Sequence, residues 1–189
     1  MNNDKFFRFS QLQPDGIKAL NAYEHISSYY DGCLTQYDRI YDLWKKVSQI
    51  DDSGDLDQIF KVKHKGMRQV VRDIHFLLIS LQVIWKSLQQ LCDEAQYPNF
   101  INLIPLKEEW NEYFDQYREP RNTFEHYDDQ IFGPDSRNNS PGYGLKLTSN
   151  GGFSLGTHDP VLINQDSRQE LEKFKNAFDN AIENTLPDA

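Results

Sequence analysis

The chain has 189 residues, of which 38% are hydrophobic and 26% are charged, so it can bury one sizeable core and needs only one. Its net charge of −9 repels nucleic-acid phosphates except where basic residues gather locally. Only Cys33 and Cys92 occur, far apart and outside any metal-ligand spacing, which excludes a disulfide framework and a zinc site.

Targeting and membrane segments are not predicted. The first ten residues, MNNDKFFRFS, lack the apolar core and the cleavage site of a secretory signal. The most apolar run, from Ile74 to Trp85, is much shorter than the roughly 20 residues that a membrane span requires. We therefore expect a single domain, residues 1–189, that is cytoplasmic and has no membrane partner.

Two long helices are predicted in the first half of the chain. Apolar residues recur every three or four positions from Pro14 to about Ser48, and any bend is expected at Asp31-Gly32. The same spacing returns from Ile59 to Leu91, after the turn and capping residues of Asp51–Asp57. A short connection between long helices favours an antiparallel pair, and such pairs usually grow into bundles.

A loop and a third helical segment are predicted next. Tyr97–Pro105 contains two prolines and is typical of a loop. The helical pattern then runs from Leu106 towards Ile131, with Pro120 inside it. Because proline removes one backbone hydrogen bond and clashes with the carbonyl four residues back, we expect the helix to kink or restart at Pro120. Arg121 would then lie at the break.

The pattern changes after Gly133. Alternating apolar and polar residues around Asn150-Gly151 predict a β-hairpin with strands near Tyr143–Thr148 and Gly152–Leu155, and Val161–Asn164 is a candidate third strand. Ser167 and Glu170 fit the S-x-x-E capping box and predict the start of a last helix. The expected apolar stripe of that helix is Leu171, Phe174, Phe178 and Ile182.

Together these elements predict a mainly α fold. The expected architecture is an up-down helical bundle of four to five helices. A small β-hairpin or three-stranded insertion, at about residues 143–164, is expected before the last helix.

The segment EPRNTFEHYDD, residues 119–129, contains the candidate site. On a continuous helix, residues four apart lie side by side, whereas residues five apart point about 140° away from each other. One interpretation pairs Arg121 with Glu125 and Asn122 with His126 on a solvated helix face that has no chemical role. The other brings Arg121 and His126 together through the long arginine side chain, a break at Pro120 or a second copy of the chain.

The six residues RNTFEH, Arg121 to His126, resemble the Arg-x4-His signature of the HEPN superfamily. HEPN proteins are all-α bundles of about this size with the signature on a late helix, and the resemblance covers residues 14–131 and 167–186. In active members two copies of the motif meet across a homodimer and cleave RNA without a metal. The resemblance implies that His126 is the general acid or base acting on the ribose 2′-hydroxyl, that Arg121 stabilises charge on the phosphorane-like transition state, and that Asn122 orients the pair.

What the resemblance implies is a metal-independent endoribonuclease of the toxin or defence type, with no cofactor and no metal site. The expected partners are a second copy of the chain, RNA or a nucleotide, and an antitoxin protein. The alternative is a non-catalytic helical dimer that acts as an interaction or nucleotide-binding module. Local charge favours the alternative, because residues Leu106–Asn139 contain four Lys or Arg against nine Asp or Glu, a balance of −5.

A basic stripe is predicted on the second long helix. Its members recur at spacings of four, three and four residues and share one helix face: Lys61, Lys65, Arg68 and Arg72. If this face borders Arg121 and His126, the stripe can follow a phosphate backbone and bind the substrate. The alternative is that acidic residues of the neighbouring helix neutralise it, namely Glu108, Glu112 and Asp115.

Overall fold

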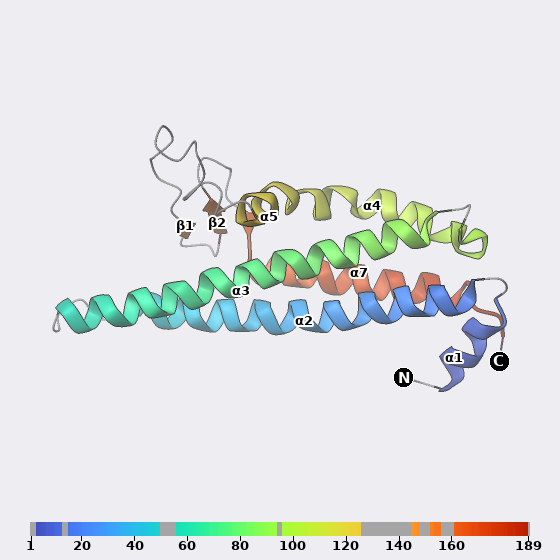
Figure 1. Ribbon diagram of the computed structural model, residues 1–189, viewed down its shortest axis with the longest axis horizontal. Coiled ribbons are helices and arrows are strands. Elements are labelled where there is room, and N and C mark those ends of the chain that lie inside the picture. The colour runs from blue at the N-terminus through green and yellow to red at the C-terminus, as the bar shows by residue number, and fades with distance from the viewer. Residues whose placement is uncertain are drawn as a thin grey trace.

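The computed structural model describes residues 3–12, 15–49, 56–93, 96–125, 145–147, 152–155 and 161–188. The helices are α1 (Asn3–Ser10), α2 (Gly16–Ser48), α3 (Leu56–Leu91), the 3-10 helix η1 (Pro98–Leu103), α4 (Ile104–Asp115), α5 (Arg118–Glu125) and α7 (Gln165–Glu183). The strands are β1 (Leu145–Leu147), β2 (Gly152–Leu155) and β3 (Val161–Leu162). The mainly helical fold with a small sheet before the last helix is as predicted (Figure 1).

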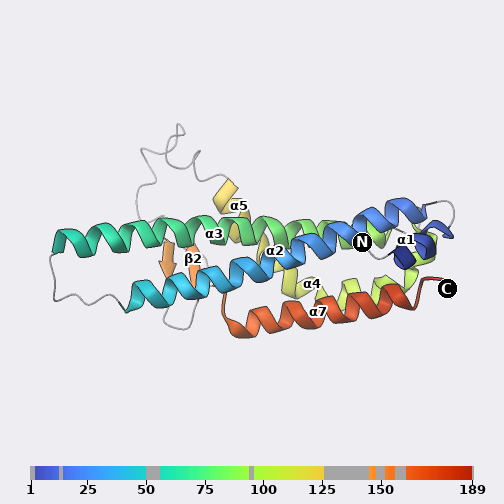
Figure 2. The same ribbon diagram turned by 90° about the horizontal axis from the view of Figure 1, so that it is seen from below.

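The long helices form an up-down bundle, which confirms the predicted architecture. α2 and α3 are antiparallel neighbours along most of the molecule, and α4 and α5 lie over α3 (Figure 1). α7 lies beside α2 and contacts α4, so α2, α3, α4 and α7 close a ring around the core (Figure 2). α2 is one helix of 33 residues that passes through Asp31 and Gly32 without interruption.

The core contains the apolar stripes that the sequence predicts. On α7, Leu171, Phe174, Phe178 and Ile182 are all fully buried. Aromatic rings connect this stripe to the other side of the bundle. The ring of Phe174 lies 5.0 Å from that of Phe114 on α4, and Phe114 stacks at 5.0 Å on Trp85 of α3. This chain of rings fixes the distance between α7, α4 and α3.

The helix break predicted at Pro120 occurs earlier in the chain. Gln116 and Tyr117 separate α4 from α5, and Pro120 is the third residue of α5. The first N–H groups of a helix have no partner within it, so a proline is tolerated there. Its clash with the carbonyl four residues back falls on Gln116, which lies between the helices. Arg121 is therefore inside α5, with its N–H bonded to the Tyr117 carbonyl at 3.1 Å.

The prediction of a loop over Tyr97–Pro105 is wrong, because most of these residues are helical. η1 begins at Pro98, and α4 begins at Ile104 with Pro105 in its first turn. Proline loses no intrahelical hydrogen bond in the first turn, and its fixed φ suits a helix start. The two prolines therefore begin helices here and do not exclude them.

The capping box of α7 lies one turn earlier than predicted. The N-cap is Asn164, whose Oδ1 accepts a hydrogen bond from the N–H of Ser167 at 3.0 Å. The Oγ of Ser167 accepts one from the N–H of Asn164 at 2.9 Å, while Glu170 pairs with Lys173. Asparagine caps a helix as well as serine does, so the S-x-x-E match selected the wrong residue.

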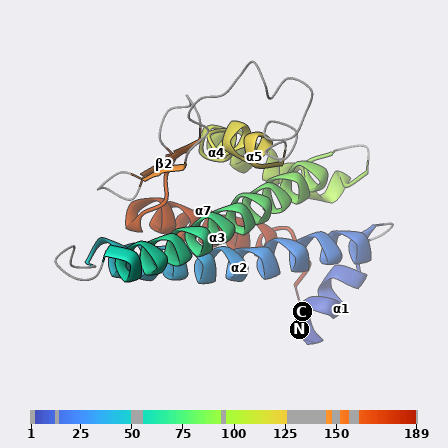
Figure 3. The ribbon, with the colours of Figure 1, turned by 60° about the vertical axis from the view of Figure 1, so that its left-hand side comes forward.

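The insertion before α7 forms a three-stranded antiparallel sheet in the order β1-β2-β3. Leu147 is opposite Phe153, and Phe153 is opposite Val161. Phe153 is buried, and β2 contacts α5, so the sheet packs beside the helix that carries Arg121 (Figure 3). The predicted turn at Asn150-Gly151 lies outside the described residues.

α1, which no pattern in the sequence predicts, binds the end of α7. Arg8 Nη1 lies 2.6 Å from Glu183 Oε2, and Arg8 Nε donates to the carbonyl of Pro187 at 2.9 Å. Lys5 Nζ lies 3.0 Å from Glu183 Oε1 and donates to Tyr23 Oη at 2.6 Å. Burial raises the pKa of Glu183, but hydrogen bonds and charge from Lys5 and Arg8 outweigh it and hold this pKa below its ordinary value of 4.5.

We expect these ion pairs to make stability depend on pH. The folded chain holds the Glu183 proton less tightly than the unfolded chain does. The contribution of the Glu183 ion pairs to the free energy of unfolding is therefore present above pH 4.5 and is lost as the pH falls below it. Glu183→Gln should lower the free energy of unfolding at pH 7 by up to about 1 kcal/mol, since the pair is partly exposed. Urea unfolding at pH 3, 5 and 7 measures this. If the difference in free energy of unfolding between the unaltered chain and the Glu183→Gln variant stayed constant down to pH 3, the lowered pKa of Glu183 would be contradicted.

Candidate functional site

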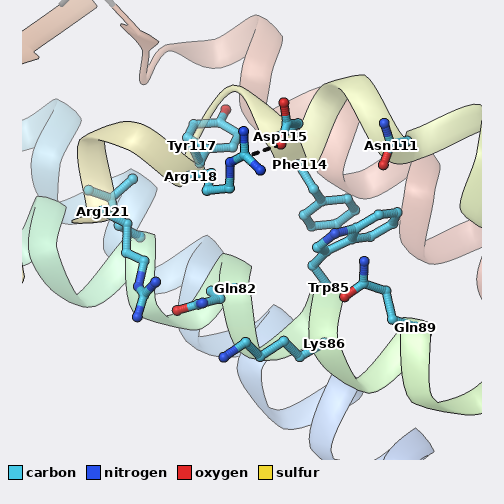
Figure 4. Close-up of a pocket in the computed structure, with 11 residues that line it drawn as sticks. Gln82, Trp85, Lys86, Gln89, Asn111, Phe114, Asp115, Tyr117, Arg118 and Arg121 are labelled. Carbon is cyan, nitrogen blue, oxygen red and sulfur yellow. Dashed lines mark ion pairs between the residues drawn. The ribbon is translucent and has the colours of Figure 1, made fainter. Parts of the chain in front are cut away.

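A pocket of about 290 Å³ opens between α3 and the α4–α5 pair (Figure 4). Among the residues that the structure describes, three cationic side chains line it, Lys86 from α3 and Arg118 and Arg121 from α5. Asp115 is its one acidic lining residue among the described residues, and Asp115 Oδ1 lies 3.3 Å from Arg118 Nε. The described lining residues therefore carry a net positive charge in a chain whose overall charge is −9.

Arg121 is half-buried at this pocket, next to Asn122. Its Nη1 donates a hydrogen bond to Asn122 Oδ1 at 2.8 Å, so the asparagine amide helps to hold the guanidinium. The structure thus brings together two of the three predicted catalytic residues. The third, His126, lies outside the described residues, as does the side chain of Glu125. Neither the pairing of Arg121 with Glu125 nor that of Asn122 with His126 is therefore decided.

Tyrosine hydroxyl groups connect the start of α5 to α2 and the end of α4 to α7. Tyr117, which immediately precedes α5, is buried, and its hydroxyl lies 3.3 Å from that of Tyr37 on α2. The hydroxyl of Tyr113 donates to the carbonyl of Ser167 on α7 at 3.1 Å. Burial raises the pKa of Tyr37, Tyr113 and Tyr117, so all three stay protonated and hydrogen-bonded near neutral pH. These contacts hold Arg118 and Arg121 at the pocket mouth against α2 and α7.

Three of the acidic residues counted along the chain lie outside the pocket. Glu108, Glu109 and Glu112 are exposed on α4, and none of them lines the pocket. Lys86, in contrast, comes from a helix that is distant in sequence. Side-chain direction therefore keeps these three carboxylates out of the pocket, whereas Asp115 and Glu119 lie 3.3 and 4.0 Å from Arg118 Nε.

The basic stripe is exposed but does not line the pocket. Lys65, Arg68 and Arg72 lie on α3 outside the pocket, and only the backbone of Lys61 is described. Within the described part of the chain, none of these three side chains forms an ion pair. The predicted pairing with Glu108, Glu112 and Asp115 is therefore not found among the described residues.

Lys86 connects the stripe to the pocket. On an ideal helix, at 100° per residue, Lys65, Arg68, Arg72 and Lys86 fall within an arc of about 60°. Arg72 and Lys86 are 14 residues apart, a rise of about 21 Å along α3. Lys86 therefore lies at the edge of the stripe and also lines the pocket.

Several pocket residues were not predicted: Gln82, Trp85, Lys86, Gln89, Asn111 and Arg118. Two of them carried a signal in the sequence. Arg118 precedes Arg121 by three residues and so shares its helix face, and Lys86 continues the stripe two heptads after Arg72. The other residues could be assigned to the pocket only after the face of α3 that meets α4 was known. The spacing of residues within one helix does not determine that face.

The two cysteines are not candidate nucleophiles. Both are buried, and burial raises the pKa of each thiol, that of Cys92 to about 11. Since the thiolate is the reactive form, little nucleophile is present near neutral pH. Within the described ranges no group of three or more His, Cys, Asp or Glu side chains could hold a metal ion.

Comparison with known proteins gives no match: no protein-family model, no curated protein and no solved structure is significantly similar to the chain. Among the described helices, none has the length and apolar character needed to cross a membrane.

Proposed function

We propose that the chain is a HEPN-like, metal-independent endoribonuclease that binds an RNA phosphate at the cationic end of the pocket. The observation that carries this proposal is the convergence of Arg118, Arg121 and Lys86 on one pocket, with Asn122 bonded to the Arg121 guanidinium. Guanidinium groups match phosphate oxygens in a forked geometry, and an ammonium adds a point charge. A toxin or defence role, an antitoxin partner and a cytoplasmic location belong to the same proposal.

The chemistry that these residues can perform is transfer of a phosphoryl group within the RNA chain. The ribose 2′-oxygen forms a bond to phosphorus while the bond from phosphorus to the 5′-oxygen breaks. One His126 accepts the 2′-hydroxyl proton, and the His126 of a second copy protonates the leaving 5′-oxygen. Arg121 binds the non-bridging oxygens, on which negative charge grows in the transition state. The products are a 2′,3′-cyclic phosphate and a 5′-hydroxyl.

A homodimer is part of the proposal because of helix geometry. Residues five apart on one helix point about 140° away from each other, so the Arg121 and His126 of one chain do not converge on the same phosphate if the helix continues. A second copy placed against α5 supplies the missing group to each phosphate. Size-exclusion chromatography with light scattering should therefore give a mass near twice 22.2 kDa.

The α3 stripe supports a polymeric ligand. From Lys65 to Leu91 the only acidic residue is Asp73, which is buried with its Oδ1 3.1 Å from Arg39 Nη2. The exposed cations of this helix face are therefore available for successive phosphates of one strand. A single nucleotide in the pocket cannot reach Arg72.

We expect the double variant Lys65→Ala/Arg72→Ala to bind RNA more weakly and with a shallower salt dependence. Each phosphate contact to a single strand contributes about 0.7 to the slope of log K against log salt, so two lost contacts should reduce the slope by about 1.4. Fluorescence anisotropy from 50 to 300 mM NaCl measures it. The matched control, Lys18→Ala/Lys173→Ala, removes two lysines that pair with Asp15 and Glu170. Equal slopes for the two double variants would exclude the stripe from RNA binding.

The function is tested by incubating the purified chain with 5′-labelled RNA in excess chelator. The expected products carry 2′,3′-cyclic phosphate and 5′-hydroxyl ends, which phosphatase and polynucleotide kinase treatment distinguish from hydrolytic ends. Intact RNA after prolonged incubation, or products with 3′-hydroxyl ends, would contradict the proposal.

A second candidate function is binding of a nucleotide or a partner without cleavage. It is favoured by the lining of the pocket, because Lys86, Arg118 and Arg121 can bind a phosphate without any contribution from His126. RNA or nucleotide binding that Arg118→Ala weakens, together with no cleavage of any substrate, would select this function.

A further inference from the structure

The end of the pocket away from Arg121 carries amide groups and an indole ring. Gln89 lies on α3 one turn after Trp85, and Asn111 lies on α4 one turn before Phe114. In Figure 4, Arg121 and Gln82 lie at one side of the pocket, and Trp85, Gln89 and Asn111 lie at the other. The pocket therefore has a cationic end and an uncharged, aromatic end.

The amide groups of this end are available to a ligand. Gln89 and Asn111 are exposed to solvent, and neither amide forms a hydrogen bond within the described part of the chain. An exposed amide offers one acceptor and two donors. Two amides on facing helices can thus meet the polar edge of one planar group that lies between them.

The indole of Trp85 supplies a flat contact surface. It stacks on Phe114, with ring centroids 5.0 Å apart and planes 14° apart, and Phe114 is buried in the core. Trp85 is only half-buried, so part of its indole faces the pocket. Because Phe114 supports the ring from one side, the indole is held in place for stacking by an aromatic ligand.

We infer that the pocket binds one adenine nucleotide unit, with its phosphate at Arg118, Arg121 and Lys86 and its base at Trp85, Gln89 and Asn111. This inference rests on the proposed function, because both place a phosphate at the cationic end. A volume of about 290 Å³ is at the lower end of the range for ligand pockets and suits one nucleotide. The unit is either part of an RNA strand or a free nucleotide.

Adenine is preferred to the other bases for a chemical reason. Glutamine and asparagine amides pair in a bidentate way with the donor and acceptor of adenine, whereas arginine and lysine match the two acceptors of guanine. In Figure 4, Arg121 and the ammonium group of Lys86 lie on the Gln82 side of the pocket, and Arg118 is turned towards Asp115, so Gln89 and Asn111 are the described polar groups beside the indole. A purine also stacks over a larger area than a pyrimidine, which favours adenine over cytosine and uracil.

The test uses the full chain and RNA that cannot be cleaved. Anisotropy of labelled 2′-O-methyl hexa-adenylate and hexa-uridylate should show about tenfold tighter binding of the adenylate, the effect of one to two net hydrogen bonds. Gln89→Ala/Asn111→Ala should remove most of this preference. The matched control is Gln169→Ala/Asn176→Ala, which removes two exposed amides from α7 and should leave the preference unchanged.

Competition then identifies the source of the nucleotide. Displacement of the labelled hexa-adenylate by free AMP, and much less by free UMP, assigns the site to a mononucleotide. Displacement by unlabelled hexa-adenylate alone assigns it to a unit within RNA. Either result supports the adenine site, provided that the Gln89→Ala/Asn111→Ala variant loses the preference for adenylate.

Failure of the inference and failure of the proposed function are separable. Equal binding of both RNAs by the unaltered chain overturns the adenine site, as does an unchanged preference in the Gln89→Ala/Asn111→Ala variant. If the Arg118→Ala variant binds both RNAs more weakly than the unaltered chain in those cases, the phosphate site is still supported. If Arg118→Ala and Arg121→Ala change neither affinity, or if no RNA or nucleotide binds, both proposals fall.

Discussion

Replacing Arg121 or His126 with alanine is expected to reduce the rate of RNA cleavage in chelator by about 10²- to 10⁴-fold. In the Arg121→Ala variant, charge that develops on the phosphate oxygens loses its guanidinium partner, and Asn122 loses the group it orients. In the His126→Ala variant, no imidazole accepts the proton of the 2′-hydroxyl, and none protonates the leaving 5′-oxygen. Single-turnover cleavage of labelled RNA measures both effects.

Three controls separate chemistry from folding. Arg121→Lys keeps the charge but loses the forked donor set, so we expect its activity to fall between that of the unaltered chain and that of the Arg121→Ala variant. Lys173→Ala, at an exposed position on α7, should cleave at the unaltered rate. Melting temperatures of all variants should agree within a few degrees. Full activity of Arg121→Ala, or equal residual activity of the lysine and alanine variants, would remove Arg121 from the mechanism.

Phe174→Ala is expected to destabilise the fold more than any change at the site. Phe174 is fully buried and its ring contacts Trp110, Phe114 and Phe178 at centroid distances of 5.0–6.1 Å. Loss of a buried phenylalanine ring costs about 3–5 kcal/mol, from lost burial and from the cavity that remains. For a chain of this length, that corresponds to a fall in melting temperature of about 6–20 °C.

The same substitution at an exposed phenylalanine provides the control. Phe7 on α1 is 59% exposed, so Phe7→Ala should change the free energy of unfolding by less than about 0.5 kcal/mol. Urea unfolding of both variants compares them directly. Similar losses at Phe174 and Phe7 would show that the aromatic chain between α7 and α3 is not the centre of the core.

The long helices could be predicted because one face of each is buried. The α7 stripe of Leu171, Phe174, Phe178 and Ile182 follows the helical repeat and is fully buried. Boundaries were predicted less well, since several residues can begin a helix. Asn164 caps α7 where Ser167 was expected, and Pro120 occupies the first turn of a new helix where a break was expected.

α1 gave no signal in the sequence because tertiary contacts stabilise it. It has only eight residues, and isolated helices of that length are marginal in water. Phe9 is fully buried in the bundle, and Arg8 bonds Glu183 and the carbonyl of Pro187. These partners lie about 175 residues away along the chain, beyond the reach of any local pattern.

At the site, the sequence indicated Arg121 and Asn122, but a charge count along the chain does not show which charged side chains share the pocket. Counting charges along Leu106–Asn139 gives a negative balance, whereas the described residues of the pocket wall include Lys86, Arg118 and Arg121 against Asp115. A sequence count adds residues that point to opposite sides of a helix, and it omits Lys86 from α3. The face on which α3 meets α4 and α5 had to be known before the pocket charge could be assigned.

The most direct test of the account is the affinity of the Arg118→Ala/Arg121→Ala variant for non-cleavable single-stranded RNA. Because each arginine is placed to make charge-assisted hydrogen bonds with phosphate, the affinity should fall about 100-fold relative to the unaltered chain, and the salt slope should decrease by about 1.4. The Lys18→Ala/Lys173→Ala variant should bind as the unaltered chain does. An affinity within twofold of the unaltered chain, at an unchanged melting temperature, would contradict a phosphate site at this pocket.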